Sequence, residues 1–286
     1  MRIGVVGAGT MGVGVAQCAY QAGHAVVVTD TDPAALDGAP ARLRDGIRLS
    51  RVLGRTELAP AGGALVPVTW SGDPAALARA EFVIECVTER IAVKQEVLGV
   101  LDRFCAPETV FASCTSGIPV GRLGSFTGRP DRVLGTHFMN PAPLKDTVEV
   151  VRGARTGDDT MRRALDLLTG MGKRAVVVND GPGFVSNRIL MLTINEAATV
   201  VRQDTADAST VDAVFTQCFG HPLGPLATAD LIGVDTVVDT LDMLREHTGD
   251  DRFIPSALLV DLVEAGRLGR KTGHGFHRYP HAGPGR

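Results

Sequence analysis

The order of apolar and polar positions divides the chain into a first part with short apolar runs and a second part with helical periodicity. In the first part, helical patterns over 11–23, 33–57, 91–104 and 158–171 separate several of the apolar runs. Alternation of strands and helices is typical of a mostly parallel sheet covered by helices. The runs that predict strands are 2–6, 24–30, 81–87, 109–113, 132–136, 147–151 and 174–178.

The pattern changes at "NDGPGF", residues 179–184. Beyond this point strand-like runs stop, and helical periodicity covers 184–203, 209–219, 226–247 and 255–266. We therefore predict a domain boundary near Gly181, with an α/β domain over 1–180 and an all-helical domain over 181–286. The Gly/Pro/His-rich tail after Tyr279 is expected to be frayed or left from cloning.

A glycine-rich run, "GAGTMG" at 7–12, lies between the first predicted strand and the first predicted helix. In this context Gly7 permits a tight turn, Gly9 lets the backbone approach a pyrophosphate, and Gly12 lets the helix pack on the strand. The helix N-terminus then receives the negative charge. Asp30, at the end of the second strand, would accept hydrogen bonds from both ribose hydroxyls and repel a 2′-phosphate, which favours NAD over NADP. The sequence thus predicts a Rossmann-type parallel sheet domain whose cofactor-binding residues in this region are Gly7, Gly9, Thr10, Met11, Gly12 and Asp30.

Composition excludes several other classes of protein. A formal net charge of −3 and the lack of a basic block give no reason to expect nucleic acid. No apolar run approaches the ~20 residues of a membrane span, and the N-terminus enters a strand-like run without the regions of a signal peptide. The 5 cysteines are scattered without a CxxC pair, which is typical of reduced thiols and not of a disulfide framework or zinc site. We expect a cytoplasmic protein without a metal.

The run "THFMNPAP", residues 136–143, follows an apolar strand and places His137 before a turn rich in proline. Imidazole, with an ordinary pKa near neutrality, is the usual proton acceptor of enzymes. A lone histidine is more often a satisfied structural residue, so His137 needs partners before it indicates catalysis.

Seven motifs together give the chain a likeness to a known family that extends from Met1 to about Tyr279. The chain resembles the 3-hydroxyacyl-CoA dehydrogenase family, which implies an NAD-dependent enzyme that oxidises an acyl thioester at its 3-hydroxyl. The motifs are "GAGTMGVGVAQ", "ECVTERIAVKQEV", "FASCTSGIPV", "THFMNPAPLKDTVEVV", "GPGFVSNRILMLTINEA", "GHPLGPLATADLIGVD" and "GRLGRKTGHGF".

The resemblance assigns four catalytic residues. It makes His137 the base that takes the hydroxyl proton and Glu149 the carboxylate that sets the ring's tautomer and stabilises the imidazolium. Ser116 and Asn187 match positions that hydrogen-bond the substrate oxygen. Because Asn187 lies beyond the predicted boundary, the resemblance implies a site between the two domains. Taken singly, Glu149 could be a strand-edge charge, Ser116 a helix cap and Asn187 a surface residue.

The resemblance also implies further contacts with the cofactor. Glu89 and Lys94 match family contacts, and Lys271 in "GRKTG" matches a lysine that reaches the cofactor from the C-terminal part. For these three a solvated surface role is the alternative. By the same resemblance Ser116 would also contact the cofactor, and Asn140, with the neighbouring prolines, would fix the turn beside the nicotinamide.

Some residues depart from the family pattern and bear on the substrate. Cys114 and Gly117 stand where relatives usually carry Asn and Ser, and Cys114 is either a buried filler or a reactive thiol. The segment 145–147, Lys-Asp-Thr, is more polar than a fatty acyl chain favours, and 33–70 holds no lysine to meet CoA phosphates, although arginines could serve. These departures favour a small or polar acyl group, carried either by CoA or by an acyl carrier protein. The carrier-protein alternative is oxidation of a glyceryl thioester in polyketide extender-unit (methoxymalonyl-type) biosynthesis.

Two alternatives of other classes follow from the same residues. A non-catalytic NAD-binding protein is disfavoured by the four intact catalytic positions. A β-hydroxyacid dehydrogenase of the phosphogluconate type relies on a catalytic lysine, and the HFxNP run weighs against it. The apolar helices of the last hundred residues, together with the resemblance, predict a homodimer formed by the helical domain.

Overall fold

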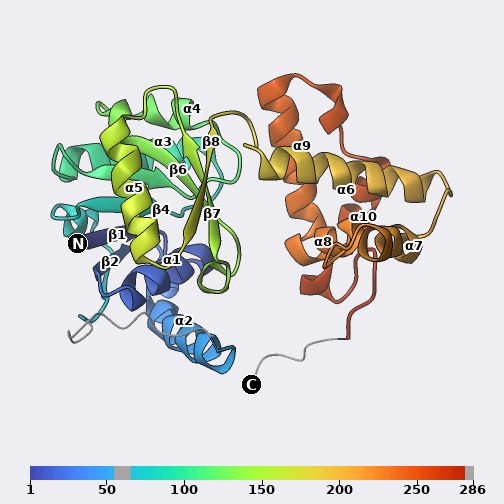
Figure 1. Ribbon diagram of the computed structural model, residues 1–286, viewed down its shortest axis with the longest axis horizontal. Helices are drawn as coiled ribbons and strands as arrows, with labels where there is room; N and C mark the ends of the chain where they lie inside the picture. Colours follow the sequence, from blue (N-terminus) through green and yellow to red (C-terminus); the bar gives the residue numbers. More distant parts are fainter. Residues whose placement is uncertain (55–65, 281–286) are drawn as a thin grey trace. The chain divides into compact units, whose positions relative to one another are not determined.

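The computed structural model describes residues 1–54 and 66–280 of the chain (Figure 1). The chain divides into two compact units, Met1–Phe184 and Val185–Arg286. The end of the predicted helix over 33–57 and most of the tail after Tyr279 lie outside the described residues.

The first unit is built on an eight-stranded sheet in the order β3-β2-β1-β4-β5-β6-β7-β8. All neighbouring strands are parallel except β6 and β7, so the predicted mostly parallel sheet is confirmed. The sequence pattern missed β3, which is short and lacks an apolar run. The strands are β1 Arg2–Val6, β2 Ala25–Thr29, β3 Thr69–Ser71, β4 Phe82–Glu85, β5 Val110–Ser113, β6 Val133–Phe138, β7 Thr147–Arg152 and β8 Arg174–Asn179.

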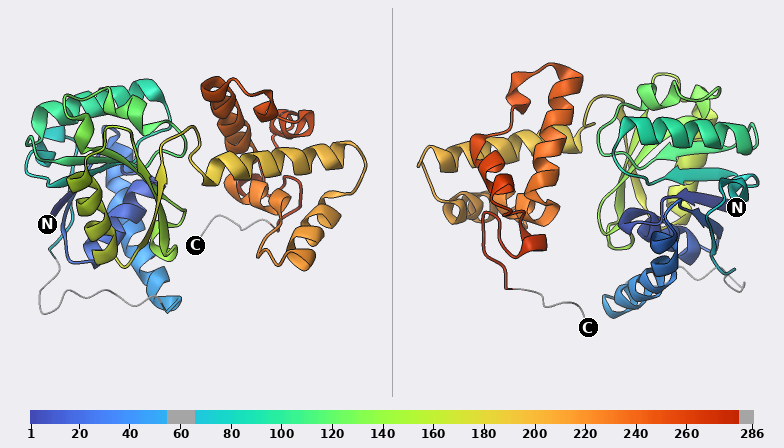
Figure 2. Two further views of the ribbon diagram at one scale, coloured as in Figure 1. Left: turned by 45° about the horizontal axis from the view of Figure 1, so that its top comes forward. Right: turned by 180° about the vertical axis from the view of Figure 1, so that it is seen from behind.

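Helices cover both faces of this sheet (Figures 1 and 2). Successive residues of a strand point to opposite faces, and β4 shows this directly: Phe82 and Ile84 belong to one apolar cluster and Val83 to another. The first cluster includes residues of α1, α2 and α5, and the second includes residues of α3 and α4. These helices are α1 Thr10–Gln21, α2 Pro33–Val52, α3 Ile91–Phe104, α4 Val120–Gly124 and α5 Asp158–Gly170, with 3-10 turns η1 Pro74–Leu77, η2 Pro130–Arg132 and η3 Ala142–Leu144.

In the described residues of the second unit every named element is a helix or helical turn, as the periodicity predicts, but the single helix predicted over 226–247 is wrong. The run 226–247 forms two helices, α8 and α9, because Gly233 adopts φ +107° and ends the first. The run 209–219 is α7 followed by a π-helical turn, η4. The elements are α6 Ser186–Arg202, α7 Ala208–Ala213, η4 Val214–Cys218, α8 Pro225–Ile232, α9 Val234–Thr248, η5 Asp251–Phe253, α10 Ala257–Glu264 and η6 Arg270–Thr272.

A buried carboxylate fixes the C-terminal segment to the helices of this unit. Asp230 of α8 is 1% exposed and accepts hydrogen bonds from the backbone N–H groups of Phe276 and His277 and from the Tyr279 hydroxyl. Buried carboxylates are stable only when hydrogen-bonded or paired, and these donors meet that need. Among the described helices of both units, none is long and apolar enough to cross a membrane.

Candidate active site

The glycine-rich turn between β1 and α1 has the geometry that the sequence predicts. A Cβ on Gly7, which has φ +100°, would lie 2.7 Å from the carbonyl oxygen of Cys86, and a Cβ on Gly12 would lie 1.8 Å from the carbonyl oxygen of Gly7. Both positions therefore need glycine. A Cβ on Gly9 would meet nothing within 4 Å, so the backbone at the start of α1 faces open space that a phosphate group fits.

Asp30 lies at the end of β2 and its carboxylate is already tied to the glycine-rich turn. One oxygen accepts a hydrogen bond from the backbone N–H of Ala8 at 2.6 Å, and the other accepts from Asp32 N–H at 2.9 Å. A cavity of about 420 Å³ opens beside it, walled by Gly9 and by apolar side chains such as Leu77 and Val97. An apolar cavity that ends at a carboxylate and at free space above Gly9 fits an adenine ring, its ribose and the pyrophosphate. The residues present thus fit NAD.

His137 and Glu149 face each other across neighbouring strands. β6 and β7 are antiparallel with His137 directly opposite Glu149, and the ring Nδ1 lies 3.0 Å from Glu149 Oε2. The two residues are 6% and 7% exposed. A carboxylate at this distance accepts the Nδ1 proton and leaves Nε2 as the basic nitrogen, a tautomer that follows from the hydrogen-bond pattern.

The turn after β8 places Phe184 beside His137, a neighbour that was not recognised from the sequence. Phe184, which adopts φ +53° and is 4% exposed, places its ring centroid 6.1 Å from that of His137. A positive φ is uncommon for a residue with a side chain and suggests a constraint at this point. The N–H of Gly183 donates to Gly117, and Asp180 accepts hydrogen bonds from two backbone N–H groups at the start of α4. The only signal in the sequence was the "NDGPGF" run itself.

Ser116 lies in the loop that follows β5, and β5 is the neighbour of β6 in the sheet. Its backbone N–H donates to Glu89 Oε1 at 2.9 Å, and the Thr115 hydroxyl donates to the same oxygen. Asn140 follows β6, is exposed, and lines a cavity of about 160 Å³ together with Thr10 of the glycine-rich run. Met11 is partly buried in the first turn of α1.

Lys94 does not lie at the surface. Its side chain is fully buried, and its Nζ lies 2.9 and 3.0 Å from the two oxygens of Glu85 and 3.2 Å from Glu89. The alternative of a solvated surface role is therefore wrong for Lys94. The Glu89 side chain is 35% exposed. Burial alone would lower the pKa of Lys94, but the two carboxylates outweigh it and raise that pKa, so the side chain is a cation.

Two of the predicted site residues belong to the helical unit. Asn187 lies in the first turn of α6 and is partly buried. Lys271 pairs with Asp235 of α9, with 2.5 Å between Nζ and each carboxylate oxygen. The roles of both residues toward a substrate or cofactor stay predictions.

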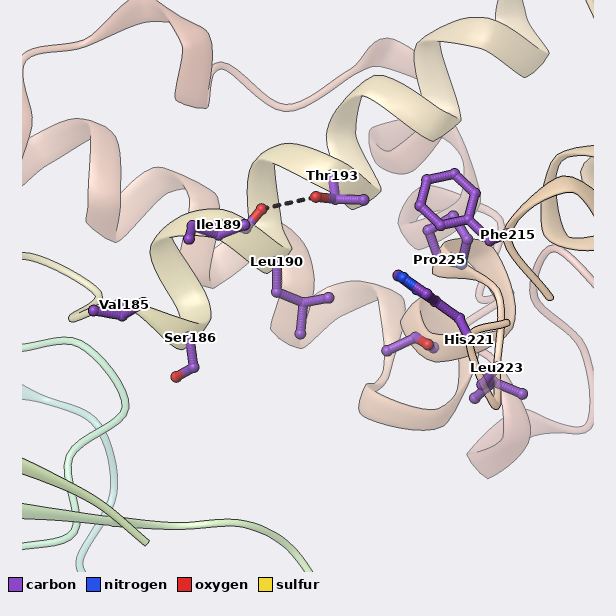
Figure 3. A pocket seen from close by; sticks show the side chains of 10 residues that line it. Val185, Ser186, Ile189, Leu190, Thr193, Phe215, His221, Leu223 and Pro225 are labelled. Atoms are coloured by element: carbon purple, nitrogen blue, oxygen red, sulfur yellow. Dashed lines mark hydrogen bonds between the residues drawn. The ribbon is translucent and has the colours of Figure 1, made fainter. Parts of the chain in front are cut away.

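The helical unit holds a mostly apolar cavity of about 320 Å³ (Figure 3). Figure 3 shows side chains of α6 on one side and Phe215, His221, Leu223 and Pro225 on the other. The rings of Phe215 and His221 meet edge to face with centroids 5.4 Å apart. The lining residues are Val185, Ser186, Ile189, Leu190, Thr193, Phe215, His221, Leu223, Pro225 and Thr228.

Comparisons with known proteins agree with this geometry. Residues 2–181 match the family model described as 3-hydroxyacyl-CoA dehydrogenase, NAD binding domain, and residues 183–279 match the model of the C-terminal domain of the same family. The chain is 40% identical to a probable 3-hydroxybutyryl-CoA dehydrogenase of Bacillus subtilis, covering 97% of each protein. It is 38% identical to a 3-hydroxybutyryl-CoA dehydrogenase of Bradyrhizobium diazoefficiens, covering 99% of this chain and 97% of that protein.

Among solved structures, the fold is similar to the crystal structure of (S)-3-hydroxybutyryl-CoA dehydrogenase from Ralstonia eutropha. The TM-score is 0.90 at 36% sequence identity, and the match covers 98% of this chain and 99% of that one. In the part of the chain that the structure describes, no three His, Cys, Asp or Glu residues form a group that could hold a metal ion.

Proposed function

The chain belongs to the 3-hydroxyacyl-CoA dehydrogenase family and is an NAD-dependent enzyme, and we propose that it oxidises the 3-hydroxyl of a short 3-hydroxyacyl-CoA. The observation that carries this proposal is the buried His137–Glu149 pair with its 3.0 Å contact. A non-catalytic NAD-binding protein would have no need to bury a carboxylate against an imidazole at this cost in desolvation.

His137 acts as the general base of the reaction. Its Nε2 takes the proton of the substrate hydroxyl, and Glu149, held at Nδ1, stabilises the imidazolium that forms. NAD held at the glycine-rich turn would supply the acceptor for the hydride that leaves the carbon bearing this hydroxyl. Because His137 and Glu149 are nearly excluded from water, their attraction is weakly screened when the ring becomes charged.

Ser116 and Asn187 orient the substrate and steady the charge on its oxygen. A hydroxyl and an amide N–H are donors, and donors placed near a developing oxyanion favour the transition state over the ground state. Ser116 is suited to this role because its loop is held by Glu89 and packs, through Gly117, against the turn that carries Phe184. Glu89, Asn140 and Lys271 are proposed as residues near the cofactor.

A short acyl group is favoured by the relatives and by the polar segment at the start of β7. The relatives reported above are named as a probable 3-hydroxybutyryl-CoA dehydrogenase and a 3-hydroxybutyryl-CoA dehydrogenase. Thr147 is on the same strand face as Glu149, two residues away, while Lys145 and Asp146 are exposed. A long alkyl chain lying against these groups would remove water from them without replacing the hydrogen bonds, at about 1–3 kcal/mol for each group.

One experiment tests the proposed substrate and also decides which group carries it. The alternative to a short 3-hydroxyacyl-CoA is a glyceryl thioester on an acyl carrier protein. The arginines of α2 suit both carriers equally, because Arg44 and Arg48 are exposed one turn apart and could meet the phosphates of either. The experiment measures kcat/KM for C4 to C10 3-hydroxyacyl-CoA thioesters and for a glyceryl carrier protein. We expect a steep fall from C4 to C10 on CoA. A rate that rises with chain length contradicts the short-acyl proposal, and a carrier-protein rate well above that of C4-CoA selects the alternative.

We also propose a homodimer in the cytoplasm. The helical unit exposes large apolar side chains, including Ile189 at 61%, Phe219 at 65% and Leu231 at 55%, which a second copy of the chain could cover. The five cysteines are free thiols, which suits a reducing compartment. The two family models meet between residues 181 and 183, which supports the proposed boundary near Gly181.

A further inference from the structure

A buried lysine contacts the turn that joins the two strands of the His137–Glu149 pair. β6 carries His137 and β7 carries Glu149, so residues 139–146 form the connection of this hairpin. Hairpin connections commonly have about 2–5 residues, and a longer one needs contacts of its own to keep a single conformation. Lys173, the residue directly before β8, makes such contacts.

The ammonium group of Lys173 meets backbone carbonyl groups of the connection. Nζ donates to the carbonyl oxygen of Ala142 at 2.8 Å and to that of Lys145 at 2.7 Å, and the carbonyl oxygen of Pro143 lies 3.4 Å away. An ammonium group has three N–H donors, so three carbonyls match its capacity. Lys173 is 8% exposed, and a charge that is removed from water is stable only when it is hydrogen-bonded. The lysine therefore fixes three points of the connection to the start of β8.

Lys173 acts from the face of the sheet opposite to His137. Ala142 belongs to the apolar cluster on the α1 side, whereas Phe184, whose ring meets that of His137, belongs to the cluster on the α3 side. Cys18 of α1 is a further neighbour on the first side: burial raises the pKa of its thiol to about 11, and the nearby ammonium of Lys173 partly opposes this. From this side of the sheet Lys173 can influence the reacting groups only through the connection.

The fixed carbonyls lie between residues that the proposed function uses. Asn140, proposed near the cofactor, lies two residues before the first of them. Thr147, which shares a strand face with Glu149, lies two residues after the last. A looser connection would displace both, and a displacement of about 1 Å in a group that orients the substrate can cost about 10²-fold in rate.

We propose that Lys173 is a positioning residue that sets the connection between His137 and Glu149, and with it the polar segment 145–147 that selects a short acyl group. The selectivity part rests on the proposed function, in which this segment disfavours long alkyl chains. The positioning part rests on the contacts of the ammonium with the three carbonyls.

The test compares Lys173→Met, which removes the charge and all N–H donors, with Lys173→Gln, which keeps an amide that can donate. Both variants should melt at a lower temperature than the wild type, Lys173→Gln less so, because unpaired buried carbonyls destabilise the fold. At saturating NAD and thioester we expect kcat of Lys173→Met to fall about 10–100-fold, and that of Lys173→Gln to fall less. The ratio of kcat/KM for C4 to that for C10 3-hydroxyacyl-CoA should fall about fivefold or more in Lys173→Met, because the polar segment is no longer held against the chain.

Arg163 of α5 offers a matched control. Its guanidinium donates to the backbone carbonyls of Glu108 at 2.7 Å and Glu81 at 2.9 Å, which precede β5 and β4 and lie outside the hairpin. Arg163→Met should lower the melting temperature, keep kcat within about twofold and leave the C4-to-C10 ratio unchanged. This control separates the loss of a cation that bonds carbonyls from the loss of the particular cation at the hairpin.

Backbone amide hydrogen exchange gives a readout that needs no substrate. The segment 139–147 should exchange faster in Lys173→Met than in the wild type, to a smaller extent in Lys173→Gln, and at the wild-type rate in Arg163→Met. Should the wild type oxidise no thioester, the proposed function fails, and the exchange result still decides whether Lys173 holds the connection.

Unchanged exchange of 139–147 in a folded Lys173→Met overturns the proposal, and so does a wild-type kcat with an unchanged C4-to-C10 ratio. A fall in kcat with an unchanged ratio overturns the selectivity part alone. Should Lys173→Met not fold, the same measurements on Lys173→Gln decide the matter, and wild-type exchange and kcat in that variant overturn the proposal.

Discussion

Replacing Glu149 by Gln tests what the buried carboxylate contributes to the reaction. The substitution keeps the side chain's size and an oxygen that can accept the Nδ1 proton, but it removes the negative charge beside His137. Two unit charges about 4 Å apart attract by about 4 kcal/mol at an effective dielectric constant of about 20. The retained hydrogen bond offsets about 1 kcal/mol of the loss. About 3 kcal/mol of stabilisation of the imidazolium is therefore lost, which corresponds to about 10²-fold in rate.

The loss should fall on kcat, because the ring carries its positive charge only as the substrate proton arrives. The assay follows NADH formation at saturating NAD and thioester, with Kd for NADH and the melting temperature as checks on folding. Glu108→Gln, an exposed carboxylate of the same unit, serves as the control and should leave kcat unchanged. A Glu149→Gln enzyme that folds, binds NADH and turns over within threefold of the wild type would refute the role given to this carboxylate.

Three further predictions concern the cofactor, the assembly and the thiols. Asp30→Ala should lower the ratio of kcat/KM for NAD to that for NADP at least tenfold, because a carboxylate that repels a 2′-phosphate is gone; an unchanged ratio counts against the assignment. Light scattering at micromolar concentration should give the mass of a dimer, and the monomer mass contradicts the proposed interface. An aromatic disulfide reagent at pH 8 should modify exposed Cys218 well before Cys18 and Cys105, because burial raises the pKa of Cys18 and of Cys105 to about 11. Equal rates of modification would show that Cys18 and Cys105 are not buried in solution.

The sequence was most informative where function depends on residues that are close together in the chain. The strand, glycine-rich turn, helix and acid of 2–30 form one continuous motif, and Gly7 and Gly12 have the steric reasons that the motif implies. His137 and Glu149 could be paired only through the family resemblance. Their direct opposition depends on the antiparallel register of β6 and β7, which local patterns do not encode.

Contacts between distant segments account for what the sequence did not predict. Lys94 was assigned to the cofactor with a surface role as the alternative, and its ion pairs were not foreseen. Its two carboxylate partners and its burial arise only when α3 packs behind β4 and β5. Phe184 received no role because its contact with His137 joins residues far apart in the chain. The break between α8 and α9 was missed because one glycine within a periodic run rarely ends a helix by itself. At Gly233 the positive φ ends it, in a place where a Cβ would lie 3.0 Å from Lys271 Nζ.

The most direct test of the account is NAD reduction by the wild type and by His137→Gln with 3-hydroxybutyryl-CoA, followed by absorbance of NADH. The account predicts that the wild type reduces NAD with this thioester. His137→Gln should bind NADH with a Kd close to that of the wild type and melt at a similar temperature, yet lose about 10²–10⁴-fold in kcat, more than Glu149→Gln loses, because the base itself is removed. A folded His137→Gln enzyme that reduces NAD at a rate near that of the wild type would contradict the central claim that this histidine takes the substrate proton.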